Sequence, residues 1–117
     1  MELKNINLLV TGGCGFIGSH FCNYIYKKVN KLIILDKLTY VANKESINYI
    51  LNSFNVILIE DDILNHNFNE TYDKYNINYI IHLAAETHVD NSYKFFKKHI
   101  DNNIIATQIL IESILNY

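Results

Sequence analysis

The chain has 117 residues, half of them hydrophobic, and this length and composition suit one compact domain with a buried core. Its formal net charge of -2 offers no basic surface to nucleic acid, and it contains no run of lysine or arginine. No apolar segment approaches the roughly 20 residues that cross a bilayer, and the N-terminus has no signal-peptide pattern. The two cysteines form no disulfide framework. We therefore expect a cytoplasmic domain without a nucleic-acid or membrane partner.

Strand-like and helix-like segments alternate along the chain. Short apolar runs bounded by turn residues predict buried strands at residues 5–10, 31–36, 55–60 and 78–82. Apolar residues at helical spacing predict helices at residues 16–29, 44–52, 67–75 and over most of 92–116. In the last helical stretch, the predicted apolar side consists of Ile100, Ile104, Ile105, Ile109, Leu110 and Ile114. Strands interleaved with helices imply an α/β fold with a parallel sheet and right-handed crossovers.

A glycine-rich segment follows the first predicted strand, where Gly12, Gly15 and Gly18 have the spacing GxxGxxG. In a strand–turn–helix unit, the first glycine permits the tight turn, and the second lets a pyrophosphate approach the backbone. The third lets the helix pack against the sheet, and the helix N-terminus then offers free N–H groups to phosphates. A glycine-rich corner without a ligand is the alternative interpretation, because this motif alone is weak evidence.

Asp36 ends the second predicted strand, roughly 20 residues after the glycines, where dinucleotide-binding folds keep the acid that binds ribose hydroxyls. A carboxylate at this place repels a 2′-phosphate, so we expect NAD rather than NADP as the cofactor. Lys37 follows directly and would soften that repulsion. An aspartate that only caps a turn is the alternative interpretation.

Four distinctive positions come at or just after the end of a predicted strand, namely Gly12, Asp36, Asp62 and Ala84. The carboxyl ends of parallel strands meet at one edge of a sheet, and open α/β sheets bind their ligands there. The sequence therefore predicts the first half of a doubly wound, Rossmann-type NAD-binding domain that occupies residues 1–117.

Four segments carry a resemblance to a known family: TGGCGFIG (11–18), DKLTY (36–40), DDI (61–63) and HLAAETHVDNS (82–92). Together they resemble the N-terminal part of the nucleotide-sugar 4,6-dehydratases of the dTDP-glucose type, in the extended short-chain dehydrogenase/reductase superfamily. The resemblance implies a homodimeric lyase that uses NAD to remove water from a nucleotide-glucose. In that reaction hydride passes from sugar C4 to NAD, water leaves across C5–C6, and hydride returns at C6. This chain would supply the NAD-binding part.

The resemblance also implies roles for individual residues. Thr87 and His88, in the polar loop after the fourth strand, would contact the substrate sugar, whereas His82 would be a satisfied structural histidine. A solvated turn for the acidic residues and core packing for the small ones are the alternatives. The expected NAD contacts are Gly12, Gly15, Phe16, Ile17, Gly18, Asp36, Lys37, Leu38, Thr39, Asp62, Ile63, Leu83, Ala84, Ala85, Glu86 and Asn102.

The chain departs from the family pattern at Ala106, where glycine is usual, and at Asn91 and Asn102, which replace arginine and threonine. The family's later Thr-Asp-Glu segment has no counterpart in this sequence. Three Tyr-xxx-Lys matches occur, but their places along the chain argue against a catalytic role: Tyr24/Lys28, Tyr40/Lys44 and Tyr93/Lys97. We therefore expect neither a catalytic residue nor a metal site here. A related NAD-dependent epimerase or decarboxylase, and a non-catalytic nucleotide-binding module, are the alternative functions.

Overall fold

The computed structural model describes residues 3–39 and 42–117. Its strands are β1 (Asn7–Thr11), β2 (Lys31–Asp36), β3 (Val56–Glu60) and β4 (Tyr79–His82). Its α-helices are α1 (Phe16–Ile25), α2 (Asn48–Leu51), α3 (Phe68–Tyr75), α4 (Val89–Lys94), α5 (Phe96–Ile100) and α6 (Ala106–Leu115). The remaining helical turns are the 3-10 turns η1 (Leu3–Asn5) and η2 (Lys44–Ile47) and the π-helical turn η3 (Asp101–Ile105).

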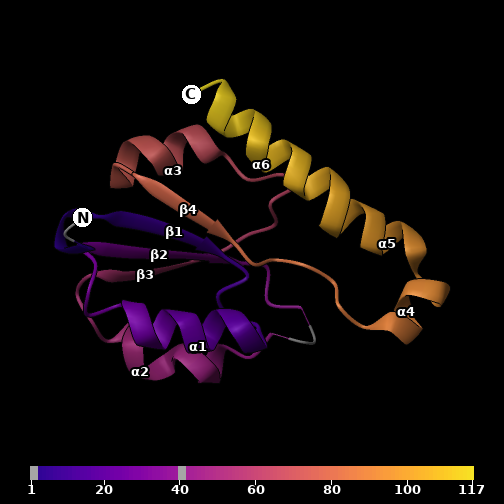
Figure 1. Cartoon of the computed structure of the whole chain (residues 1–117), viewed down its shortest axis with the longest axis horizontal. Helices are drawn as coiled ribbons and strands as arrows, with labels where there is room; N and C mark the ends of the chain where they lie inside the picture. The colour runs from indigo at the N-terminus through magenta and orange to yellow at the C-terminus, as the bar shows by residue number, and fades with distance from the viewer. Residues whose placement is uncertain (1–2, 40–41) are drawn as a thin grey trace.

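All strands run parallel, in the order β3-β2-β1-β4 (Figure 1). The chain moves outward from β1 to β3 and then returns to the other side of β1 to form β4. In such a topology a crevice opens between the loops that leave the two strands on either side of the reversal, here β1 and β4. The predicted α/β fold and parallel sheet are confirmed, and this crevice is where folds of this type bind their ligands.

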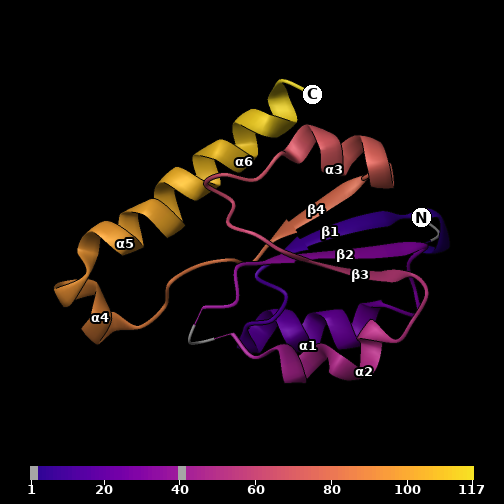
Figure 2. The ribbon, with the colours of Figure 1, turned by 180° about the vertical axis from the view of Figure 1, so that it is seen from behind.

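Helices cover both faces of the sheet, with α1 and α2 on one face and α3 and α6 on the other (Figures 1 and 2). The α1 and α2 layer packs against Leu8 and Val10, whereas the opposite layer packs against Leu9 and Ile33. Successive residues of a strand point to opposite faces, so both sets must be apolar when both faces are covered. This arrangement explains why the strands appear in the sequence as unbroken apolar runs.

Asparagine side chains define the ends of two helices. The prediction extends the first helix to residue 29, but α1 ends at Ile25, and the side chain of Asn55 donates to the Tyr26 carbonyl oxygen (2.7 Å). That bond satisfies a carbonyl group that a longer helix would have satisfied internally. Helix α3 begins after Asn67, whose side chain accepts a backbone hydrogen bond from the first turn, and ends at Asn76 in a left-handed conformation (φ 51°).

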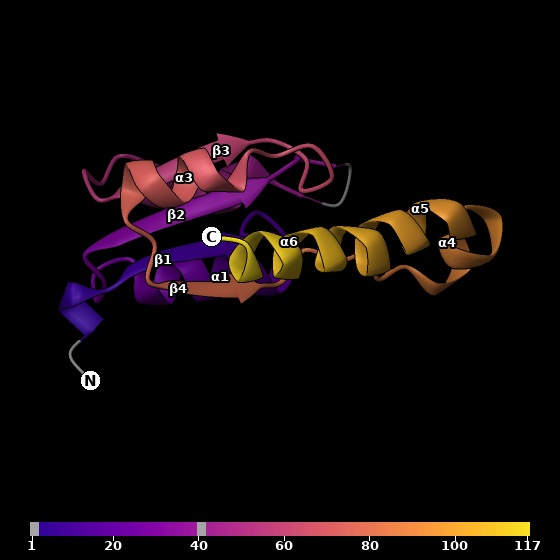
Figure 3. The ribbon, with the colours of Figure 1, turned by 90° about the horizontal axis from the view of Figure 1, so that it is seen from above.

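The C-terminal helices differ most from the prediction. Helices α5 and α6 form one long rod with η3 between them, and the α5 end projects beyond the sheet (Figure 3). Ile109 and Leu110 pack on the sheet as predicted, but the prediction was wrong for four exposed residues: Ile100, Ile104, Ile105 and Ile114. Isoleucines occur on all sides of this rod, so their spacing does not indicate which side packs against the sheet. The buried side chains of Ala106 and Leu110 lie on the side of the rod that packs against the sheet.

Candidate functional site

The loop after β1 packs directly against the loop after β4. Gly12 has a φ of +71°, a left-handed conformation that favours glycine, and its N–H donates to the Leu35 carbonyl (2.9 Å). A Cβ on Gly12 would lie 2.6 Å from the backbone N and Cα of Ala84. A Cβ on Gly18 would overlap the Gly12 carbonyl oxygen, whereas a Cβ on Gly15 would meet only that oxygen, at 3.4 Å. Packing therefore requires Gly12 and Gly18, while open space remains beside Gly15.

The buried Asp36 carboxylate joins the glycine loop to the end of β2. Its Oδ2 accepts a hydrogen bond from the N–H of Cys14 (2.8 Å), and its Oδ1 accepts one from the N–H of Leu38 (2.8 Å). Leu38 has a φ of 53°, which is uncommon for leucine. A carboxylate has about four lone-pair sites, so Asp36 can still accept hydrogen bonds from a ligand.

Lys37 and the end of β3 form the next side of the site. The Lys37 ammonium donates to Asn102 Oδ1 (2.6 Å) and lies 3.4 Å from Asp62 Oδ2. Asp62 Oδ1 accepts from the N–H of Leu64 (3.1 Å), and Ile63 between them is buried. The side chain of Lys37 is therefore bound to groups from two other elements of the site.

Asp61 connects the same loop to α3. Its Oδ2 lies 2.7 Å from His66 Nδ1, and its Oδ1 accepts from the N–H of Asp62 (2.8 Å). The hydrogen bond with His66 is the main reason that the pKa of Asp61 falls below its usual value. His66 Nε2 lies 2.7 Å from Thr71 Oγ1, so the imidazole bridges the loop and the helix.

Side chains of the π-helical turn hold the segment after β4. Asn103 binds both backbone groups of Glu86, since its Oδ1 accepts from the N–H (2.7 Å) and its Nδ2 donates to the carbonyl (2.9 Å). The buried Glu86 carboxylate accepts from Asn102 Nδ2 (3.0 Å), and the same oxygen lies 3.4 Å from Lys98 Nζ. π-helical turns are rare and occur frequently at functional sites. This one directs two consecutive asparagines at a single loop residue.

A pocket at the carboxyl edge of the sheet brings together most of the expected cofactor contacts. They are Gly12, Gly15, Asp36, Lys37, Thr39, Asp62, Ile63, Leu83, Ala84, Ala85, Glu86 and Asn102. Gly18 and Leu38 do not line the pocket, and neither do Thr87 and His88. Phe16 and Ile17 also lie outside its lining, exposed at the start of α1 (82% and 70%).

Some residues of the site were not predicted. The pocket also includes Leu35, Ala42, Asp61 and Ala106, and Asn103 binds the backbone of Glu86 in the pocket wall. Asn103 had a visible signal in the sequence, because an Asn-Asn pair interrupts an apolar helical run. Asp61 belongs to the DDI segment and Ala106 is a departure from the family pattern, but neither was expected to line the pocket, and Leu35 and Ala42 had no signal that separates them from ordinary core or turn residues.

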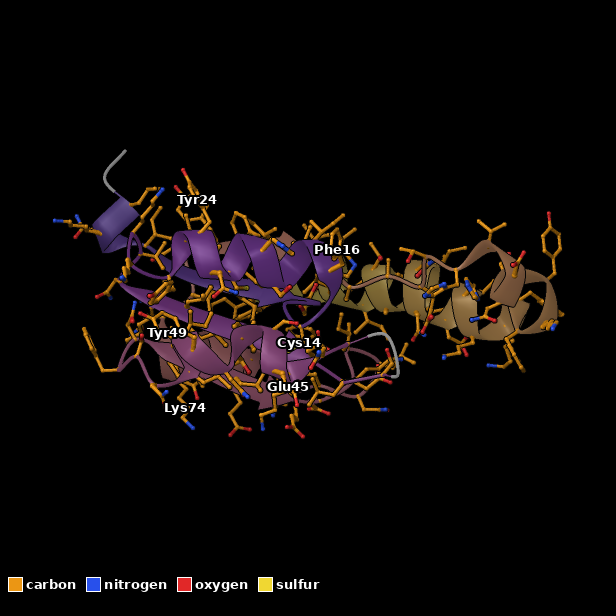
Figure 4. The ribbon with its side chains drawn as sticks, turned by 90° about the horizontal axis from the view of Figure 1, so that it is seen from below. Cys14, Phe16, Tyr24, Glu45, Tyr49 and Lys74 are labelled. Carbon is orange, nitrogen blue, oxygen red and sulfur yellow. The ribbon has the colours of Figure 1, made fainter. Side chains whose placement is uncertain are left out.

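Of the three Tyr-xxx-Lys matches, the two whose tyrosine the structure describes do not line this pocket with that tyrosine. Lys28 Nζ lies 3.2 Å from the centre of the Tyr24 ring, at the opposite end of α1 from Phe16 (Figure 4). Tyr93 is 83% exposed on α4, and Tyr40 lies outside the described residues. Within the described ranges, no three His, Cys, Asp or Glu side chains gather as a metal site. The helices described here include none that is both long and apolar enough to span a membrane.

Cys14 and Cys22 are buried thiols that form no disulfide. Burial, assisted by the nearby Asp36 charge, raises the pKa of each thiol to about 12. The thiolate is the reactive form of cysteine, so neither side chain is a nucleophile at neutral pH. The cysteine in the glycine loop is therefore a packing residue.

A parallel sheet of order β3-β2-β1-β4, with a glycine turn after β1 and a buried acid after β2, defines a Rossmann-type α/β domain. Residues 9–117 match the sequence model of the family described as GDP-mannose 4,6 dehydratase, which is nearly the whole chain. The chain belongs to this family.

Two curated relatives show how much of such a protein the chain represents. It is 43% identical over 113 residues to dTDP-D-glucose 4,6-dehydratase of Dictyostelium discoideum, which covers 94% of this chain and 26% of that protein. It is 39% identical over 114 residues to dTDP-glucose 4,6-dehydratase of Haemophilus influenzae, which covers 96% of this chain and 34% of that protein. The chain therefore spans about a quarter to a third of the length of these relatives.

Solved structures share the fold. The dTDP-glucose 4,6-dehydratase DesIV from Streptomyces venezuelae, solved with NAD bound, has a TM-score of 0.84 and 31% identity, covering 95% of this chain and 36% of that one. A UDP-N-acetylglucosamine 4-epimerase from Methanobrevibacter ruminantium has a TM-score of 0.86 and 31% identity, covering 97% of this chain and 35% of that one. Dehydratases and epimerases thus share this part of the fold, and its shape alone does not separate them.

Proposed function

We propose that this chain is the NAD-binding part of a nucleotide-sugar 4,6-dehydratase of the dTDP-glucose type. One observation carries the proposal: residues at or just after the ends of four strands meet at one pocket. Gly12 and Gly15 follow β1, Asp36 ends β2, Asp62 follows β3, and Ala84 follows β4. A dinucleotide consists of a pyrophosphate and two nucleosides, and residues of these kinds can contact each of those parts.

The start of α1 suits the pyrophosphate. Gly15 is the N-cap of this helix and provides no side-chain acceptor, so the first-turn N–H groups and the positive end of the helix dipole are left for an anion. The space beside Gly15 is open, because an added Cβ would meet only the Gly12 carbonyl oxygen. A phosphate could therefore approach the backbone there.

The end of β2 suits an unphosphorylated adenosine ribose. Asp36 would accept hydrogen bonds from the ribose hydroxyls with its remaining lone pairs, and Asp62 and Ile63 would hold the adenine. Lys37 is bound to Asn102 and Asp62, which leaves it less available to compensate a 2′-phosphate. These contacts favour NAD over NADP.

The loop after β4 suits the nicotinamide end. The small residues Leu83, Ala84 and Ala85 would lie along the nicotinamide ribose, and Thr87 and His88 would face the sugar of the substrate. When bound, NAD would supply the hydride acceptor for the reaction. The residues of this chain would bind and orient the cofactor, and they would exclude water from the part of the cofactor that lies in the pocket.

A nucleotide-sugar epimerase is the second candidate function, because an epimerase matches the fold as well as a dehydratase does. The segment Glu-Thr-His-Val-Asp at residues 86–90 favours the dehydratase, since related epimerases and decarboxylases usually differ there. The identities of 43% and 39% to dTDP-glucose dehydratases support the same choice.

Calorimetric titration of the purified chain with NAD tests the cofactor part of the proposal. We expect saturable binding that Asp36→Ala weakens strongly, because the variant loses the ribose acceptor and the anchor of the glycine loop. Asp73→Ala, which removes an exposed carboxylate from α3, is the matched control and should bind normally. Absence of NAD binding to a folded wild-type chain would refute the proposal.

We expect this chain alone to form no 4-keto-6-deoxy sugar from dTDP-glucose and NAD. General acid–base catalysis contributes about 100- to 10,000-fold and requires a base within reach of the reacting hydroxyl. Tyr24 and Tyr93 do not line the pocket, so we expect neither to act as that base. Catalytic formation of the product would contradict this expectation and would point to the pair Tyr93 and Lys97.

We also propose a homodimer in a cytoplasmic setting. The exposed isoleucines of α5 and α6 support the dimer, because apolar helix faces of this kind are typical of protein interfaces. The two unbridged cysteines support a reducing compartment. Sedimentation analysis over a range of concentrations would measure the association, and a strictly monomeric chain would contradict the dimer.

A further inference from the structure

His82, the last residue of β4, has a hydrogen-bonding partner at each ring nitrogen. Nδ1 lies 2.6 Å from Thr11 Oγ1 at the end of β1, and Nε2 lies 2.9 Å from Thr107 Oγ1 in α6. Thr11 Oγ1 also accepts from the N–H of Ala84 (3.4 Å). The imidazole ring therefore connects two strand ends to the helix that covers them.

The hydroxyl of Thr107 determines the direction of these hydrogen bonds. It donates its only proton to the Asn103 carbonyl (2.8 Å), so it can only accept from His82, and the ring must carry a proton on Nε2. Burial lowers the pKa of His82, which keeps the ring neutral at pH 7. Nδ1 is then an acceptor, and the hydroxyl of Thr11 donates to it.

The result is a one-way chain of hydrogen bonds from the Ala84 N–H to the Asn103 carbonyl. The side chain of Asn103 then binds both backbone groups of Glu86. Both ends of the segment 84–86 are thus connected to one position in the π-helical turn, and His82 is the link between the sheet and that position.

We propose that His82, as the neutral ring with its proton on Nε2, is a positioning residue that sets the backbone of residues 84–86 against Gly12. This inference rests on the proposed function, because that backbone is the wall along which the nicotinamide end of NAD would lie. On its other side this backbone packs tightly against Gly12, since no Cβ fits between Gly12 and Ala84. A histidine that only filled space in the core would not orient this wall.

The protonation state is tested directly on the ligand-free chain. Nitrogen-15 NMR of the imidazoles distinguishes a proton on Nε2 from one on Nδ1. We expect His82 to be neutral at pH 7 with its proton on Nε2. A proton on Nδ1, or a doubly protonated ring, would overturn the inference even if every variant folded poorly.

Two substitutions separate positioning from space filling. His82→Phe fills a similar volume without hydrogen bonds, whereas His82→Gln restores a donor near the place of Nε2. We expect the amide protons of Ala84 and Glu86 to exchange about 10-fold faster in His82→Phe, as the loss of one hydrogen bond implies. His82→Gln should recover most of the protection of Glu86. Equal losses in both variants, or no loss in His82→Phe, would show a role in packing only.

Thr107→Val and His20→Phe complete the test. Thr107→Val removes the acceptor of the Nε2 proton at nearly constant volume, so the Glu86 amide should exchange about as fast as in His82→Phe. His20→Phe makes the same substitution at an exposed position of α1, outside the hydrogen-bond chain, and should leave both amides unchanged. A Glu86 amide that is insensitive to Thr107→Val would overturn the inference.

Titration with NAD distinguishes a failure of this inference from a failure of the proposed function. If both hold, NAD affinity falls about 5- to 10-fold in His82→Phe and about twofold or less in His82→Gln. If the wild-type chain binds no NAD while the NMR and exchange results are as expected, the positioning of residues 84–86 stands and the proposed function is wrong. If NAD binds and His82→Phe changes neither exchange nor affinity, the proposed function stands and the positioning role is wrong.

Discussion

Gly15 is the N-cap of α1 and Gly18 lies in its first turn, yet the structure predicts opposite effects when each is replaced by alanine. A Cβ at position 15 meets only the Gly12 carbonyl oxygen, at 3.4 Å, which is an ordinary contact. Gly15 has a φ of -73°, which alanine adopts without strain. A Cβ at position 18 would overlap that carbonyl oxygen and lie 2.8 Å from the Cα of Gly13. Both neighbours are backbone atoms, which cannot rotate away.

The contacts at the two positions lead to different expected changes in stability and in NAD affinity. Gly15→Ala should leave stability unchanged or raise it by about 0.4–1 kcal/mol, because alanine loses less conformational entropy on folding. The same methyl group would occupy the space of the pyrophosphate and weaken charge-assisted hydrogen bonds worth about 1.5–3 kcal/mol, so NAD affinity should fall roughly 10- to 100-fold. Gly18→Ala should cost about 1–3 kcal/mol through overpacking, which lowers Tm by roughly 4 °C or more.

Thermal melting followed by circular dichroism, and NAD titration of the same samples, measure both effects. Gly15→Ala should melt at or above the wild-type Tm and bind NAD weakly, whereas Gly18→Ala should melt earlier. Wild-type NAD affinity in Gly15→Ala would refute the argument that the pyrophosphate approaches this loop. A wild-type Tm in Gly18→Ala would refute the close packing of α1 on the loop.

NADP should bind at least about tenfold more weakly than NAD because of repulsion by the buried Asp36 carboxylate at the end of β2. Lys37→Met should leave this difference unchanged, since the ammonium is already bound to Asn102 and Asp62; a larger difference in titrations with both nucleotides would show that Lys37 offsets the repulsion. Cys14 and Cys22 should react with Ellman's reagent at pH 8 only after denaturant is added, because burial raises both pKa values to about 12; rapid reaction of the folded chain would contradict their burial. Asp61 has a lowered pKa in the folded state, so its contribution to stability is present above the unfolded-state pKa and is lost as pH falls through the folded-state pKa. Asp61→Asn should therefore make Tm less sensitive to acid, and an unchanged slope of Tm against pH would contradict the pairing with His66.

The sheet and its functional edge could be predicted from the sequence because both depend on local patterns. The strand Lys31–Asp36 was predicted with both ends correct, since an apolar run ends there at an acidic residue. The other strands were predicted to within two residues at each end. Parallel strands place their carboxyl ends together whatever the details of packing, so Gly12, Asp36 and Ala84 could be assigned to one pocket in advance.

The hydrogen-bond partners within the site could not be predicted, because they join residues that are far apart in the sequence. Lys37 binds Asn102, and His82 binds Thr107; neither pairing has a signature in composition or spacing. Asn55, which binds the Tyr26 carbonyl just after α1, is 29 residues away from it in the sequence. These contacts follow from the fold and cannot be inferred without it.

The π-helical turn η3 lets the C-terminal rod hold one more residue than a regular α-helix would hold over the same span. The turn closes with a hydrogen bond from the Ala106 N–H to the Asp101 carbonyl, one residue more than an α-helical turn requires. Deleting one residue there would convert it to an ordinary α-helical turn, and the residues of α6 would keep their orientation toward the sheet. A deletion between Thr107 and Leu110, in the regular helix, would instead rotate Leu110 by about 100° about the helix axis and out of the core. This turn is therefore the place where the rod accommodates an additional residue without a change in the face that α6 presents to the sheet.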